Sequence, residues 1–215
     1  MGAKMKLAWL TDIHLNFLDE DARNSFYQDI LKLPCEALLI TGDVAEAPSL
    51  TNQTILLGHD GWADGRLGDY TNSRVSLNDS RMIHDLFEAK MYGNFKLLDK
   101  MQELADADAV QLLRDIKQAA ELKPKKIIVL THVPPFREAC QHLGGISGDD
   151  WLPYFASKAI GDVLIYAAES YRDIEFLVLC GHTHSDAVYE PLDNMKVKAG
   201  GAEYGRPGVQ GVVEV

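Results

Sequence analysis

The sequence predicts a single α/β domain, and three observations support this. The chain has 215 residues, a length that suits one domain and is marginal for two. Its composition, with 47% hydrophobic and 25% charged residues, is ordinary for a globular protein and excludes a disordered or low-complexity chain. Short apolar runs alternate along it with amphipathic segments, which is the pattern of strands alternating with helices.

Five short apolar runs are predicted to be strands of this α/β sheet. They are residues 6–11, 37–41, 54–57, 127–131 and 174–180. After residue 181 the pattern changes to short β segments separated by turns that contain Gly or Pro. These segments are residues 187–189, 195–199 and 209–215.

Three helices are predicted between the strands. Over residues 19–33 the apolar residues recur every three or four positions and so share one helix face. Helices are also predicted over residues 94–122, which Pro124 ends, and over 151–171, where Pro153 is tolerated in the first turn. The predicted buried face of the second helix consists of Leu98, Met101, Leu104, Leu112, Ile116 and Ala119.

The chain is acidic, with 21 Lys and Arg against 32 Asp and Glu and a net charge of −11. No stretch concentrates basic residues, so bulk charge does not favour nucleic acid or anionic membranes. No apolar run has the length of a membrane span or of a secretory signal, and a soluble, cytoplasmic protein is expected. An anionic substrate would be repelled unless a local positive centre, such as a metal, reversed the sign.

Side chains that could bind metal follow four of the predicted strands. They are Asp12, His14, Asp43, His132, His182 and His184. In an open α/β sheet the carboxyl ends of the strands line the ligand crevice, so these side chains would converge there. In an extended segment, residues i and i+2 project to the same side, so Asp12 and His14, or His182 and His184, could bind one centre together. The sequence therefore predicts a dinuclear metal site.

The ligand types indicate which metals would bind. Mixed imidazole and carboxylate ligands suit Zn, Fe or Mn and argue against the all-oxygen cages of Ca or Mg. No cysteine accompanies them, so a purely structural zinc site is not expected. Each element alone could be a turn carboxylate or a surface histidine. Their occurrence in order, each at a strand end, favours metal binding.

These four elements together resemble the calcineurin-like metallophosphoesterase superfamily over nearly the whole chain. The matching strings are Asp12-x-His14, Gly42-Asp43, His132 and Gly181-His182-Thr183-His184. The resemblance implies a four-layer α/β/β/α sandwich, two mixed sheets flanked by helices, with two divalent transition metal ions at one edge. The implied ligands of the first metal are Asp12, His14, Asp43 and His184. Asp43 would bridge to the second metal, which His132 and His182 would also bind.

One element of the family pattern is absent, namely the Gly-Asn-His-Asp/Glu motif that supplies an Asn ligand and a His acting on the leaving group. The nearest string is Gly58-His59-Asp60. Either it is a degenerate motif, with His59 a candidate catalytic residue, or a segment between about Pro48 and Thr54 is lacking. We favour the second interpretation, because the ten residues 44–53 are too few for a parallel crossover. An antiparallel strand at residues 54–57 is the alternative.

The loop over residues 58–70 contains candidate substrate-binding residues. Arg66 could bind a phosphate, Trp62 could stack on a base or an apolar leaving group, and Asp60 lies beside them. An ordinary surface loop is an equally good interpretation of this stretch.

The resemblance implies a single-domain phosphoesterase that hydrolyses a phosphate mono- or diester, which could be a nucleotide or cyclic nucleotide. The implied nucleophile is a hydroxide that bridges the two metals held by Asp43. A small phosphate ester is the expected partner, because no basic or aromatic strip for a nucleic-acid polymer is present. The alternative is a catalytically impaired binding or scaffold protein of the same fold, consistent with the absent motif.

Overall fold

The computed structural model describes residues 5–11, 13, 19–41, 53–142 and 144–214. The strands in these ranges are β1 (Lys6–Thr11), β2 (Ala37–Thr41), β3 (Thr54–His59), β4 (Lys126–Thr131), β5 (Gln141–His142), β6 (Gly145–Ile146), β7 (Glu175–Cys180), β8 (Ala187–Leu192), β9 (Met195–Ala199) and β10 (Val209–Glu214). The helices are α1 (Glu20–Leu31), α2 (Asp79–Met82), α3 (His84–Met91), α4 (Asn94–Glu121), α5 (Leu152–Phe155) and α6 (Lys158–Ser170), with a short 3-10 turn at Arg137–Ala139.

The strands form two main sheets, both of them mixed. In the small sheet, of order β10-β1-β2, β1 is antiparallel to β10 and parallel to β2. In the large sheet, of order β3-β4-β7-β9-β8, only the edge strand β8 runs antiparallel to its neighbour. Strands β5 and β6 form a separate hairpin. The prediction of an α/β fold with mixed sheets is confirmed.

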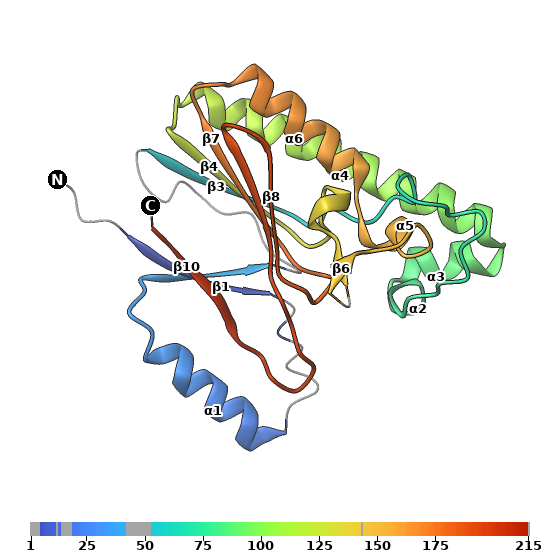
Figure 1. Cartoon of the computed structure of the whole chain (residues 1–215), viewed down its shortest axis with the longest axis horizontal. Helices are drawn as coiled ribbons and strands as arrows, with labels where there is room; N and C mark the ends of the chain where they lie inside the picture. Colours follow the sequence, from blue (N-terminus) through green and yellow to red (C-terminus); the bar gives the residue numbers. More distant parts are fainter. Residues whose placement is uncertain (1–4, 12, 14–18, 42–52, 143, 215) are drawn as a thin grey trace.

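The two sheets share one apolar core, and helices lie outside them. Along β4, Ile128 and Leu130 pack against side chains of the small sheet, while Ile127 and Val129 pack among residues of α4 and α6. Figure 1 shows α4 and α6 on the outer side of the large sheet and α1 beyond the small sheet. Because β3, β4, β7 and β9 run parallel to one another, their carboxyl ends lie at the same edge of the large sheet.

The predicted strands begin and end within three residues of the observed ones, but the helices differ more. The single helix predicted over residues 151–171 is wrong, because an extended Ala156 separates α5 from α6. No helix was expected at α2 or α3. In α4 the buried residues include Leu97 and Ala105, whereas the predicted Leu98 and Leu104 are only partly buried.

Strand β3 belongs to a different sheet from β2. It pairs in parallel with β4, so the alternative of an antiparallel strand is wrong. Because β2 and β3 lie in separate sheets, their connection is not a crossover within one sheet. The segment predicted to be lacking, between about Pro48 and Thr54, falls mostly outside the described residues and stays a prediction.

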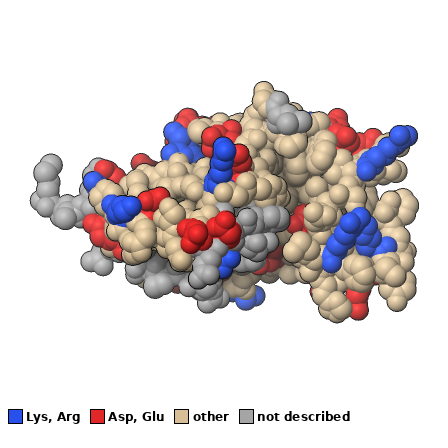
Figure 2. Space-filling model, turned by 90° about the horizontal axis from the view of Figure 1, so that it is seen from below, with Lys and Arg blue, Asp and Glu red and all other residues tan. Residues whose placement is uncertain are grey.

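Two surface properties bear on possible partners. The face in Figure 2 carries Lys and Arg side chains that are scattered among acidic ones. Across the ranges that the structure describes, none of the helices has the length and apolar character needed to cross a membrane.

Candidate metal site at the strand ends

The structure describes three of the six predicted metal ligands, namely His132, His182 and His184. The other three, Asp12, His14 and Asp43, lie outside the described residues. Asp12 comes directly after β1 and Asp43 follows β2 by two residues. The last residues of these strands, Thr11 and Thr41, are paired in parallel register.

His132 and His182 come together at the ends of the neighbouring strands β4 and β7. The distance from His132 Nε2 to His182 Nδ1 is 3.1 Å, and both rings are partly buried. His182 Nε2 lies 2.9 Å from the backbone carbonyl oxygen of Tyr154. A carbonyl only accepts hydrogen bonds, so Nε2 carries a proton, and in a neutral ring with this tautomer the Nδ1 lone pair faces His132.

This pair fits two ligands of a transition metal ion. Histidines that bind metals usually donate their other ring N–H to a carboxylate or carbonyl, as His182 does to Tyr154. Two imidazole nitrogens that each lie about 2.0–2.1 Å from a Zn²⁺ ion are separated by little more than the observed 3.1 Å. Within the described part of the chain, no group of three or more His, Cys, Asp or Glu could hold a metal. Further ligands would therefore come from the residues beyond it.

The turn after β7, residues 181–184, holds both of its histidines in a left-handed backbone conformation. The φ angles are 67° at His182 and 56° at His184. The expectation that these two residues lie in an extended segment and project to one side is therefore wrong. The ring of His184 instead packs against Tyr204, with 5.0 Å between centroids. Left-handed backbone at a residue other than Gly is unfavourable by roughly 1–2 kcal/mol.

The loop after β3, residues 60–70, covers the histidine pair. The Asp60 carbonyl accepts a hydrogen bond of 2.9 Å from the His132 amide. The Trp62 ring is stacked on His132, with centroids 6.2 Å apart, and lies edge-on to His182 at 6.1 Å. A Cβ at Gly61 would come within 2.1 Å of Thr131 Oγ1, so only glycine allows this approach. Of the predicted substrate-binding residues, Asp60 and Trp62 are therefore close to the pair.

The Arg66 side chain is paired with two carboxylates. Its guanidinium lies 3.1 Å from Asp64 and 2.8 Å from Asp106. The hydrogen bond to Asp106, more than that to Asp64, raises the pKa of Arg66 above its ordinary value. Phosphate binding by Arg66 stays a prediction.

His59 faces the helix layer. Its Nε2 atom lies 3.1 Å from Asp115 Oδ2 on α4, and the side chain is 13% exposed. Residues alternate along a strand, and Ile55 and Leu57, which share the face of His59, belong to the core against α4 and α6. This period of two could have placed His59 on the helix side from the sequence. Among the described residues, the contact of the His59 ring is with Asp115 and not with the histidine pair, and its catalytic role stays a prediction.

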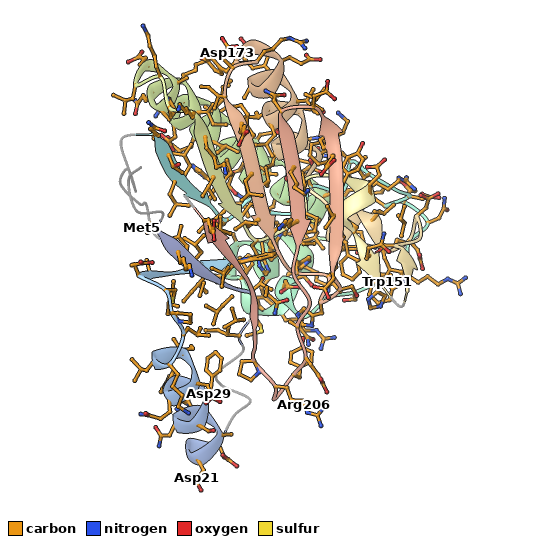
Figure 3. The ribbon with its side chains drawn as sticks, turned by 60° about the vertical axis from the view of Figure 1, so that its left-hand side comes forward. Met5, Asp21, Asp29, Trp151, Asp173 and Arg206 are labelled. Carbon is orange, nitrogen blue, oxygen red and sulfur yellow. The ribbon has the colours of Figure 1, made fainter. Side chains whose placement is uncertain are left out.

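The two sheets meet at Gly200, directly after β9. Its amide donates a hydrogen bond of 2.9 Å to the carbonyl oxygen of Cys180, the last residue of β7. A Cβ at Gly200 would lie 2.7 Å from Thr11 Cγ2 at the end of β1. In Figure 3, Asp173 marks the opposite end of β7, and Arg206, on the β9–β10 connection, marks the end that carries the site. The end of β1 that precedes Asp12 thus lies beside the strand that precedes His182.

Sequence reasoning did not identify the partners of His182. The carbonyl of Tyr154 orients its ring, and the Phe155 ring contacts it edge-on at 5.6 Å. Both residues lie on α5, inside what the sequence predicts as one continuous helix. A backbone carbonyl leaves no signal in the residue type, so only the tertiary structure reveals this contribution.

No protein-family model matches the chain, and no curated protein is significantly similar to it in sequence. The residues of the site themselves therefore carry the functional proposal.

Proposed function

We propose that the chain is a metal-dependent phosphoesterase that hydrolyses a small phosphate mono- or diester. The observation that carries the proposal is the pair of His132 and His182, with the Tyr154 carbonyl turning the Nδ1 lone pair of His182 towards His132. The order of layers in Figure 1, helix, sheet, sheet and helix, is consistent with the four-layer metallophosphoesterase sandwich that the sequence motifs imply. The meeting of β1 with β7 and β9 at Gly200 supports the participation of Asp12.

The residues of the chain have distinct roles in this proposal. His132 and His182 bind one metal, and the ligands added by resemblance are Asp12, His14, Asp43 and His184, with Asp43 shared between two metals. The chemistry supplied by two bound Fe, Mn or Zn ions is activation of water and neutralisation of the phosphate charge. Trp62 forms an aromatic wall beside the pair and limits the access of bulk water. His59 is left without a role, since it faces α4.

Metal content and turnover test the proposal. The purified chain, loaded with Mn²⁺, is expected to bind two equivalents and to hydrolyse an aryl phosphate mono- or diester, with activity lost on chelation. His182→Ala and Asp43→Ala are expected to lower turnover by at least about 100-fold, because each removes a proposed ligand. His84→Ala is the matched control, since His84 on α3 is 79% exposed and should not affect turnover. Unchanged turnover in both ligand variants would refute the proposal.

A second candidate is a binding or scaffold protein that shares the fold and lacks catalysis. It is favoured by the absence of the Gly-Asn-His-Asp/Glu motif and by the orientation of His59, which leaves no acid for the leaving group among the predicted residues. Metal binding by the wild-type chain without turnover of any ester in the screen supports this candidate. Chelator-sensitive turnover that His182→Ala abolishes excludes it.

A further inference from the structure

Asp64, in the loop after β3, is a carboxylate with no exposed surface. Its Oδ1 atom accepts a hydrogen bond of 3.0 Å from the Arg66 amide. Its Oδ2 atom accepts from the Arg66 guanidinium at 3.1 Å and from the Ala159 amide at 2.8 Å. Among the residues that the structure describes, Asp64 is the one acidic residue that is buried. A buried carboxylate is tolerated only with such pairing, so these donors depend on its charge.

The main-chain amides of Asp64 and Gly65 connect the loop to α5 and to the residue that follows it. The Asp64 amide donates to the Ala156 carbonyl at 3.3 Å, and the Gly65 amide donates to the Pro153 carbonyl at 3.0 Å. The side-chain bond to Ala159 extends this connection to the first turn of α6. Residues 154 and 155 lie between the two attachment points.

The segments connected in this way hold both histidines of the site. Residues 154 and 155 contact His182, through the Tyr154 carbonyl at 2.9 Å and the Phe155 ring at 5.6 Å. Trp62, two residues before Asp64, is stacked on His132. A change at Asp64 would therefore be transmitted to the pair from both sides.

We infer that Asp64 is a positioning residue: its buried side chain fixes the loop whose main-chain amides bond to residues 153 and 156, and thereby fixes the orientation and the ring tautomer of His182. This role of Asp64 rests on the proposed function, because a metal binds His182 only when the Nδ1 lone pair is free and correctly oriented. The hydrogen-bonded geometry itself is present in the metal-free protein, so it can be examined separately.

The terminus of α6 provides a matched control for this inference. Ser157 occupies the N-cap position but makes no side-chain hydrogen bond there, because Asp64 accepts the Ala159 amide instead. Both side chains are fully buried at the same helix end. Ser157→Ala therefore alters this terminus without touching the connection to α5.

Imidazole ¹⁵N NMR of the metal-free chain, at a pH where histidine is neutral, tests the inference. The wild type and Ser157→Ala are expected to show His182 as one tautomer with Nε2 protonated. Asp64→Asn is expected to show a tautomer mixture and a Zn²⁺ affinity lower by about 10- to 100-fold. A folded Asp64→Asn variant with the wild-type tautomer would overturn the inference.

A second variant decides the matter if Asp64→Asn does not fold. Arg66→Gln removes the guanidinium that donates to Asp64 and leaves the hydrogen bond from the Ala159 amide in place. It is expected to change the His182 tautomer in the same direction by a smaller amount, and an unchanged tautomer overturns the inference. Because the spectra are recorded on the metal-free protein, their result does not depend on whether the chain is a phosphoesterase.

Discussion

The two segments that hold the histidine pair are stabilised in opposite ways. The loop over residues 60–70 is held by carboxylates that accept backbone and guanidinium hydrogen bonds, above all by Asp64. The turn over residues 181–184 is held by its backbone, with His182 and His184 in left-handed conformations. Buried, paired charges make the loop depend on side-chain chemistry, whereas the turn depends on which conformations its residues can adopt. The loop contributes to stability, whereas the left-handed residues of the turn reduce it.

Removing the charge of Asp64 is expected to have the largest effect on stability. Asp64→Asn leaves Arg66 and the Ala159 amide without their charged acceptor and should lower the free energy of unfolding by about 3–5 kcal/mol. Denaturant titration measures the change. Asp106→Asn is the control: Asp106 is 58% exposed, so its loss should cost at most about 1 kcal/mol. Equal costs for the two variants would show that burial of the pair is unimportant.

Adding a methyl group at Gly200, where the two sheets meet, is expected to have an intermediate effect on the free energy of unfolding. In Gly200→Ala the new methyl group meets Thr11 Cγ2 at 2.7 Å and should cost about 1–3 kcal/mol. Gly208→Ala is the control, since nothing lies within 4 Å of its Cβ. Adding Thr11→Ser removes the opposing methyl group, and the double variant should recover part of the loss. A Gly200→Ala protein as stable as the control would contradict the close approach.

Replacing His184 by glycine, which adopts left-handed backbone without strain, is expected to preserve or raise stability, unlike the two substitutions above. His184→Gly should leave the metal-free protein as stable as before or more stable by up to about 1 kcal/mol, while metal affinity falls. His84→Gly is the control, because His84 has an ordinary φ, is 79% exposed and should lose up to about 1 kcal/mol. Thermal unfolding with and without Zn²⁺ separates the two effects. Destabilisation of His184→Gly without metal would argue against strain in the turn.

The smallest effect is expected at Ser157. An ordinary N-cap serine contributes about 0.5–2 kcal/mol, but Ser157 makes no cap hydrogen bond, and its buried hydroxyl has no hydrogen-bond partner. Ser157→Ala should therefore change the free energy of unfolding by less than about 0.5 kcal/mol. A decrease in the free energy of unfolding of about 0.5–2 kcal/mol, measured by denaturant titration, would mean that Ser157 and not Asp64 caps α6.

The strands could be predicted because apolar runs and the residues that end them are local signals. Residues 6–11, 37–41 and 195–199 coincide with β1, β2 and β9. The break between α5 and α6 was missed, although Ser157 is a residue type preferred at helix N-caps. The side chain that accepts the Ala159 amide belongs to Asp64, 95 residues away along the chain. The serine alone therefore does not reveal which group caps this helix.

For the site, the position of residues at strand ends was sufficient to bring His132 and His182 together. The assumption of extended geometry failed at His184, because a turn with two left-handed residues follows β7. Strand alternation, had it been applied from Ile55, would have placed His59 towards α4. Asp12, His14 and Asp43 stay predictions. Backbone contributions such as the Tyr154 carbonyl require the folded structure.

The backbone amide of Gly200 can be used to measure local opening of the structure by hydrogen exchange. Its amide hydrogen is bonded to Cys180 in the large sheet, and its Cα approaches Thr11 in the small sheet. Exchange of this hydrogen with deuterium requires that bond between β7 and β9 to open. The exchange rate of this one amide would therefore report how often these two strands separate at the edge where the metals are proposed to bind.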